Sequence, residues 1–272
     1  MSARDEERAH GVTPGLSADY AARTAERQAA FLVPRLRPGI DLLDVGCGPG
    51  TITLGLARAV APGSATGIDH DAAHVDAASA LATEREISNA CFLVGDALSL
   101  PFEDETFDAA FENNVFIHIS EDAVRAAEEV LRVLKPAGLF AARDADAEAV
   151  VWGNANDSTR RLDELMIAWQ RSRGSDVTLG KRLPSILREA GFVGMVKSVS
   201  ADTKGDPAAT HSHAGMAISL LEGPLGEAIA ENGWAEEAEV ERLKEGIREW
   251  GEHPDAFFAN VHVEVVGQKP HY

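Results

Sequence analysis

The stretch Leu42-Leu43-Asp44-Val45-Gly46-Cys47-Gly48-Pro49-Gly50-Thr51 decides the fold of this chain. An apolar run, Ile40–Val45, leads directly into three glycines, and a helical pattern, Ile52–Val60, follows them. This order predicts a buried strand, a tight turn and a helix, the first part of a strand–helix–strand unit. Glycine lets the backbone turn sharply and lets a ligand approach the main chain without meeting a Cβ atom. The turn is therefore a candidate ligand site, although a sharp turn needs glycine for its geometry alone.

The same alternation continues through the first two thirds of the chain. Further short apolar runs lie at Ala65–Ile68, Ala90–Val94, Phe107–Val115 and Gly138–Ala142, and helical patterns lie at Asp71–Arg85 and Glu121–Leu134. Strands that alternate with helices predict a doubly wound, mostly parallel sheet, which is an α/β fold.

The last third of the chain is less regular. Its predicted elements are helices at Leu162–Arg173 and Leu183–Ala190, strands at Val193–Val199 and Phe257–Val266, and a helical segment from the polar stretch Ala201–Pro207 to about Glu252. Within that segment, Val240, Leu243, Ile247 and Trp250 recur at three- and four-residue spacing. Such a stripe favours packing on the chain's own core over a face that binds a partner. We also expect Trp152, Trp169 and Trp250 to lie in the core.

Composition excludes several classes of protein. Of 272 residues, 45% are hydrophobic and 25% charged, which is typical of a globular chain. The formal net charge of −19 repels phosphate backbones and anionic lipids, so a nucleic-acid partner is not expected. Two cysteines, Cys47 and Cys91, make neither a disulfide framework nor a thiolate metal site. The charged start and the lack of 18 consecutive apolar residues predict no membrane span and a cytoplasmic protein.

Two more acids follow predicted strands. Asp69 ends the second apolar run about twenty residues after the glycines, and Asp96 follows the third run. An acid at the position of Asp69 suits two ribose hydroxyls, which also fits a dinucleotide enzyme. The spacing G-x-G-x-G, with Pro49 inside it, differs from the G-x-G-x-x-G that cradles a pyrophosphate. Together with Asp44, these acids favour a ligand with hydroxyls, an amine and a positive charge over one with phosphates.

In their joint order, several segments resemble the class I S-adenosylmethionine-dependent methyltransferases, and within them the branch of ubiquinone and menaquinone C-methyltransferases and related natural-product enzymes. The resemblance covers roughly residues 20 to 145 well and the rest loosely. The segments are Arg23–Glu26, Leu42–Thr51, Gly67–Asp69, Gly95–Ala97, Leu100–Phe102, Thr106–Asp108, Leu131–Pro136 and Val266–Pro270.

The resemblance implies S-adenosylmethionine as cofactor and S-adenosylhomocysteine as product. It implies that the glycine turn holds the amino-acid part of the cofactor, that Asp69 binds ribose, that His70 lies beside the adenine, and that Asp96 meets the adenine amine. An N-terminal helix with Tyr20 and Arg23 folds over the cofactor in similar enzymes, or packs plainly on the core. The cofactor-binding residues expected are Tyr20, Arg23, Asp44, Gly46, Gly48, Gly50, Asp69, His70, Asp96, Ala97 and Asn113.

Methyl transfer from a sulfonium is an in-line displacement and requires no metal. A histidine near the methyl group suits removal of a proton from the acceptor. His118, after the fourth strand, and His211, before the last strand, are the candidate catalytic residues. The alternatives are that His118 anchors the next helix and that His211 begins a solvated helix. His70 and His74 have the spacing of a metal pair on a helix, but no further ligands converge on them, so no metal site is expected.

Charged residues at Arg143-Asp144-Ala145-Asp146 either orient a polar substrate or form a solvated strand end. The expected organisation is one domain, residues 1–272, with an N-terminal helical cap (1–37), a seven-stranded cofactor-binding core (38–201), a helical substrate lid (202–254) and a final strand and tail (255–272).

The expected reaction is methyl transfer to an oxygen or carbon of a small, largely apolar acceptor, such as a quinone precursor or polyketide. The alternatives are an inactive cofactor-binding sensor or assembly protein, and a nicotinamide-dependent oxidoreductase. The oligomeric state stays open, with a homodimer as one option.

Overall fold

The computed structural model describes residues 22–271, which divide into two compact units. The core unit comprises the described residues 22–144, 179–199 and 263–271. The helical unit comprises residues 145–178 and 200–262. Strands β7 (Val193–Lys204) and β8 (Phe257–Gln268) contribute residues to both units.

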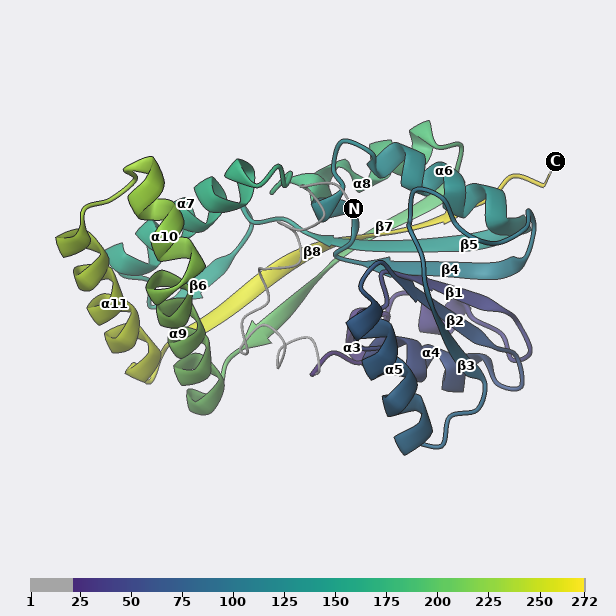
Figure 1. The fold of residues 1–272 in the computed structure, drawn as a ribbon, viewed down its shortest axis with the longest axis horizontal. Coiled ribbons are helices and arrows are strands. Elements are labelled where there is room, and N and C mark those ends of the chain that lie inside the picture. Colours follow the sequence, from purple (N-terminus) through teal and green to yellow (C-terminus); the bar gives the residue numbers. More distant parts are fainter. Residues whose placement is uncertain (1–21, 272) are drawn as a thin grey trace. The chain divides into compact units, whose positions relative to one another are not determined.

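The core unit contains the predicted parallel sheet. Its first five strands are β1 (Leu42–Val45), β2 (Ala65–Asp69), β3 (Ala90–Val94), β4 (Phe107–Asn113) and β5 (Leu134–Ala145). They lie in the order β3-β2-β1-β4-β5, all parallel, and β8 follows β5 (Figure 1). Asp44 of β1 lies opposite Gly67 on one side and Phe111 on the other. Parallel pairing brings the carboxyl ends of these strands to one edge of the sheet.

Helices cover both faces of this sheet. On one side lie α3 (Ala25–Gln28), α4 (Thr51–Val60) and α5 (Ala72–Glu84), and on the other lie α6 (Ala123–Val133) and α8 (Leu179–Glu189) (Figure 1). Successive strand residues point to opposite faces. Leu43 and Val45 therefore pack with α6 and α8, whereas Leu42 packs with α3 and α4. The shorter turns are η1 (Val33–Arg35) and η2 (Phe116–His118).

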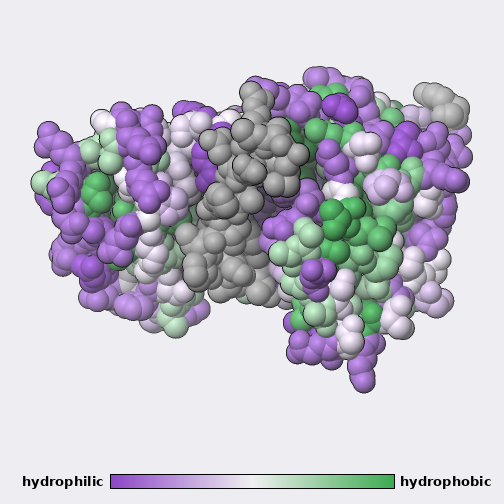
Figure 2. All heavy atoms as spheres, viewed as in Figure 1, coloured by the Kyte–Doolittle hydropathy of each residue, from purple (hydrophilic) through white to green (hydrophobic). Residues whose placement is uncertain are grey.

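The helical unit is built from α7 (Asp157–Ser172), α9 (Pro207–Glu222), α10 (Pro224–Asn232), α11 (Glu237–Glu252) and β6 (Val151–Gly153). Leu243, Ile247 and Trp250 of α11 share a buried cluster with Trp169, and Trp152 packs against it. The predicted stripe is thus confirmed as core contact, and the three tryptophans lie in or against the core as expected. Hydrophilic side chains cover most of the visible surface over α11 (Figure 2).

Strand β5 is longer than the predicted Gly138–Ala142, since it spans Leu134–Ala145, and two further strands, β6 and β7, also differ from the prediction. The described residues form an eight-stranded sheet, and the additional strand is β6, which pairs antiparallel with Phe257–Ala259 of β8. Three residues are too few for a periodic pattern to reveal. Strand β7 runs on to Lys204 through part of the polar stretch, because this largely exposed strand, paired with β8, tolerates polar side chains. Of the helices in the part of the chain that is described, none has the length and apolar character needed to cross a membrane.

Candidate functional site

The glycine turn lies between β1 and α4 and is closed on two sides. Gly46, Gly48 and Gly50 have φ angles of +69°, +52° and +79°, a region that favours glycine. A Cβ atom on Gly46 would overlap with the side chain of Val115, and one on Gly50 would overlap with Phe92. At Gly48, no atom of the described residues lies within 4 Å of such a Cβ. The turn is therefore walled at its first and last glycines and open at the middle one.

Asp69, at the end of β2, joins this turn directly. Its Oδ2 accepts a hydrogen bond from the Gly48 N–H (2.8 Å), and its Oδ1 accepts one from the Asp71 N–H (3.0 Å). His70 Nδ1 and His74 Nδ1 lie 3.3 Å and 3.5 Å from the same Oδ1. Burial raises the pKa of Asp69, but the two nearby histidines and the hydrogen bonds from the two N–H groups prevail and hold this pKa well below its usual range. Asp69 is an ionised carboxylate, which only accepts hydrogen bonds and so suits hydroxyl donors.

Asp44 lies beneath the turn and has different surroundings. It is 2% exposed, and its Oδ2 accepts a hydrogen bond from Thr53 Oγ1 of α4 (2.6 Å). Burial raises the pKa of Asp44 to about 7; the hydrogen bond from Thr53 lowers it and the charge of Asp69 raises it further. Asp44 thus ties β1 to the start of α4. A direct contact between Asp44 and a ligand stays a prediction, and Thr53 is a partner that the sequence reading missed.

The end of β3 contributes the third predicted acid. The Gly95 N–H donates to the backbone oxygen of Asp69 (2.9 Å), which brings the following loop beside β2. Asp96 is exposed on that loop, where its Oδ1 accepts from the Leu98 N–H (2.9 Å), and Ala97 is partly buried against the core. The structure therefore brings the glycine turn, Asp69, His70 and Asp96 to one edge of the sheet.

The end of β4 reaches the same edge. Asn113 is 8% exposed and pairs in register with Arg143 of β5, whose Nη1 donates to Asn113 Oδ1 (2.8 Å). The chain then forms η2, which ends at the exposed His118. Because Val115 of this segment contacts Gly46, the segment lies against the glycine turn. The predicted roles of Asn113 and His118 remain predictions, and their positions at this edge suit them.

Two buried carboxyls support this segment: Asp144, which belongs to the charged run at the end of β5, and Glu112, to which the sequence analysis gave no role. Glu112 accepts hydrogen bonds from the Val115 N–H (3.1 Å) and the Arg143 N–H (2.9 Å), and Asp144 accepts one from the Ile117 N–H (3.2 Å). The negative charge of Asp144 also acts on Glu112 and raises its pKa. Burial raises the pKa of Glu112 well above its usual range and that of Asp144 to about 7. The sequence signal that could have revealed Glu112 is its position at the end of an apolar strand, directly before two asparagines.

The reading of Arg143-Asp144-Ala145-Asp146 as a solvated strand end is wrong. Arg143, Asp144 and Asp146 are 1%, 0% and 1% exposed. Charged groups remain buried only when they are paired or hydrogen-bonded, and the printed sequence does not show which partners meet them.

The remaining predicted residues are more scattered. Arg23 is partly buried just ahead of α3, and Tyr20 lies outside the described residues. His211 is exposed on α9, whereas His213 stacks on Phe258 with ring centroids 4.2 Å apart. Among residues 22–271, no group of three or more His, Cys, Asp or Glu side chains is arranged to hold a metal ion, and the pair His70 and His74 instead faces Asp69.

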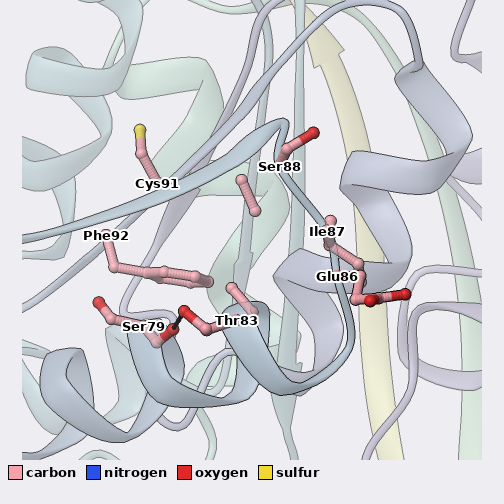
Figure 3. A pocket seen from close by; sticks show the side chains of 9 residues that line it. Ser79, Thr83, Glu86, Ile87, Ser88, Cys91 and Phe92 are labelled. Atoms are coloured by element: carbon pink, nitrogen blue, oxygen red, sulfur yellow. Dashed lines mark hydrogen bonds between the residues drawn. The ribbon is translucent and has the colours of Figure 1, made fainter.

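A hollow of about 550 Å³ lies between α5 and β3 (Figure 3). Its lining includes Glu86, Ile87 and Ala90, the first residue of β3, together with Cys91 and Phe92. It begins at the amino end of the strand, away from the carboxyl edge that carries the acids. This hollow is therefore not the candidate site.

Comparisons with known proteins agree with this geometry. Residues 42–138 match the family model described as a methyltransferase domain. The probable methyltransferase ltbC of Aspergillus luteorubrus is 31% identical over 268 residues, which is 91% of this chain and 92% of that protein. The uncharacterized methyltransferase C1B3.06c of Schizosaccharomyces pombe is 34% identical over 144 residues, so this chain spans about half of its length (51%).

A solved structure shares the fold. The YcgJ protein of Bacillus subtilis superposes with a TM-score of 0.59 at 20% identity, covering 89% of this chain and 98% of that one. The alignment with ltbC extends over nearly the whole of both proteins, beyond the matched domain. This chain belongs to the class I S-adenosylmethionine-dependent methyltransferases.

Proposed function

We propose that this protein transfers the methyl group of S-adenosylmethionine to an oxygen or carbon atom of a small, largely apolar acceptor, such as a quinone precursor or a polyketide. The observation that carries this proposal is the pairing of Asp69 with the glycine turn. An ionised carboxylate accepts from the Gly48 N–H, and a Cβ atom at Gly48 would meet no atom of residues 22–271 within 4 Å. A ligand with hydroxyl donors can bind the carboxylate of Asp69 and at the same time lie against the backbone at Gly48.

The residues at this edge fit the parts of the cofactor. Asp69 would accept hydrogen bonds from the ribose hydroxyls, and Asp96 with His70 would lie beside the adenine. The turn at Gly46–Gly50 would hold the amino-acid part, because its glycines allow close approach. When bound, S-adenosylmethionine supplies a methyl group on a positively charged sulfur. The protein then has to align the acceptor with that methyl group and exclude water.

The acceptor side of the proposal consists of a candidate base and a candidate lid. His118 would remove a proton from the acceptor if the reaction needs a base, since imidazole titrates near neutral pH. Residues 202–254, which include α9, α10 and α11, form the proposed substrate lid. Partly buried apolar side chains of α9, Met216 and Ile218, support an apolar acceptor. The net charge of −19 supports a small-molecule acceptor over a nucleic acid.

Calorimetry tests the cofactor assignment first. We expect the purified protein to bind S-adenosylhomocysteine with micromolar or tighter affinity and to show no comparable affinity for NAD or NADP. Tight binding of a nicotinamide cofactor without binding of S-adenosylhomocysteine would contradict the proposal. Transfer of a radiolabelled methyl group to a panel of quinols, phenols and polyketides then tests the reaction. Cofactor binding with no transfer to any of them would favour the sensor alternative.

A further inference from the structure

The side-chain amide of Asn113 is held in one orientation. Its Oδ1 accepts a hydrogen bond from Arg143 Nη1 (2.8 Å). Its Nδ2 is buried and has no hydrogen-bond partner among residues 22–271. A flipped amide would place its NH₂ group against the guanidinium, where two donors would face each other. The N–H donor of Asn113 is therefore the end that points away from Arg143. Buried donors are rarely left unpaired, so this N–H group is a candidate to be completed by a ligand acceptor.

Arg143 is itself fixed from behind. It is 1% exposed, and its Nε lies 3.7 Å from Glu264 Oε1 of β8. Glu264 Oε2 in turn accepts a hydrogen bond from Ser198 Oγ of β7 (2.6 Å). A row of side chains thus runs from β7 through β8 and β5 to the end of β4. Arg143 has a charge partner behind it and the amide oxygen in front, so it orients Asn113.

The register of the sheet places this donor beside the glycine turn. Glu112 pairs with Val45, so Asn113, one residue later, lies level with Gly46. Neighbouring strands are about 4.8 Å apart, which is within the reach of one side chain. Asp69, the proposed ribose partner, ends β2, two strands away from β4. An N–H donor needs an acceptor atom, and beyond the ribose and the adenine, the cofactor's oxygen acceptors are those of its amino-acid carboxylate.

We infer that Asn113 donates from Nδ2 to the carboxylate of bound S-adenosylmethionine or S-adenosylhomocysteine, and that Arg143 is the positioning residue that holds the amide in this orientation. The inference rests on the proposed function and adds to it a specific contact for the amino-acid part of the cofactor. It also gives the buried Arg143 guanidinium a role besides its ion pair with Glu264, since the guanidinium orients the amide of Asn113.

Comparison of two ligands distinguishes the loss of this contact from general damage to the cofactor site. S-adenosylhomocysteine carries the amino-acid part, whereas 5′-methylthioadenosine has the adenine, ribose and sulfur without it. Asn113→Asp still accepts from Arg143 but has no donor, and its negative charge repels a carboxylate. We expect it to weaken S-adenosylhomocysteine at least about tenfold in calorimetry and to leave 5′-methylthioadenosine within about twofold. Asn113→Ala, which is neutral, should show the same selectivity with a smaller loss.

A matched control is available in the same unit. Asn89 also uses its amide Nδ2, but donates it to the backbone oxygens of Ala57 and Gly63 ahead of the amino end of β3. Asn89→Asp should leave the affinity for both ligands within about twofold. Circular dichroism and a thermal melt establish that each variant is folded before its binding is compared.

A double-mutant cycle tests the positioning role. Arg143→Lys keeps the charge and loses the planar fork, so it should weaken S-adenosylhomocysteine in the wild-type background. It should add no further loss to Asn113→Ala, because the amide it orients is gone. Additive losses, equal losses for both ligands, or an unchanged dissociation constant in folded Asn113→Asp would each overturn the inference. Wild-type protein that binds neither ligand would instead contradict the proposed function.

Discussion

Alanine substitutions at two glycines of the turn separate its structural role from its role in ligand binding. Gly46 and Gly48 both have positive φ angles, +69° and +52°. Holding alanine in this left-handed region costs about 1–2 kcal/mol at either position. At Gly46 the new Cβ also overlaps with Val115 Cγ2, whereas at Gly48 no atom in the described part of the chain lies within 4 Å. Overpacking adds about 1–3 kcal/mol. We therefore expect Gly46→Ala to lose about 2–5 kcal/mol of unfolding free energy and Gly48→Ala only about 1–2 kcal/mol.

Binding should follow the opposite order. The methyl group of Gly48→Ala projects into the open space beside Asp69, where the proposal places the cofactor, so S-adenosylhomocysteine should bind at least about tenfold more weakly. For a chain of this size, each 1 kcal/mol shifts the melting temperature by about 2–4 °C. Gly48→Ala should thus melt only a few degrees below the wild type and still bind poorly.

Urea unfolding and calorimetry on the same samples test both parts. Trimming the wall with Val115→Ala should restore part of the stability lost in Gly46→Ala and do nothing for Gly48→Ala, because only the first clash involves Val115. Wild-type affinity in folded Gly48→Ala would refute the open-backbone reasoning. Equal unfolding free energies for the two single variants would refute the assignment of Val115 as the wall.

Asp69→Ala should weaken S-adenosylhomocysteine at least about tenfold, and an unchanged dissociation constant would show that the ribose lies elsewhere. Burial raises the pKa of Asp44 to about 7 in the folded state from 3.8, so the folded state keeps a proton that the unfolded state releases, and the unfolding free energy should fall as the pH rises from about 4 to 7. Asp44→Asn should flatten this slope in urea titrations at several pH values, and an unaltered slope would count against it. His118→Ala should lower turnover about a hundredfold or more with unchanged cofactor affinity if His118 is the base, whereas lower thermal stability with normal turnover would support the anchoring role. His211→Ala and Met216→Ala should raise the acceptor KM or lower turnover and keep the S-adenosylhomocysteine dissociation constant within about twofold; loss of cofactor affinity in step with activity would remove them from the lid.

The sequence by itself determined the order of the core elements and the edge on which the candidate site lies. Apolar runs predict the strands, and parallel pairing brings their carboxyl ends together. The sequence alone therefore predicts that Asp69 and Asp96 lie near the glycine turn. These features depend on neighbouring residues and on the small set of connections that such units allow. Strand β6 was not predicted because three residues are too few to show a periodic pattern of apolar side chains.

Tertiary structure alone decided which charged groups are buried and how they are paired. Arg143 meets Asn113, 30 residues earlier, and Glu264, more than a hundred residues later, and Glu112 meets Asp144 across two strands. Whether a carboxyl keeps its proton or an amide faces one way depends on these distant partners and on the loss of water around them. A sequence pattern records the side chains but not the contacts that fix their charge and orientation.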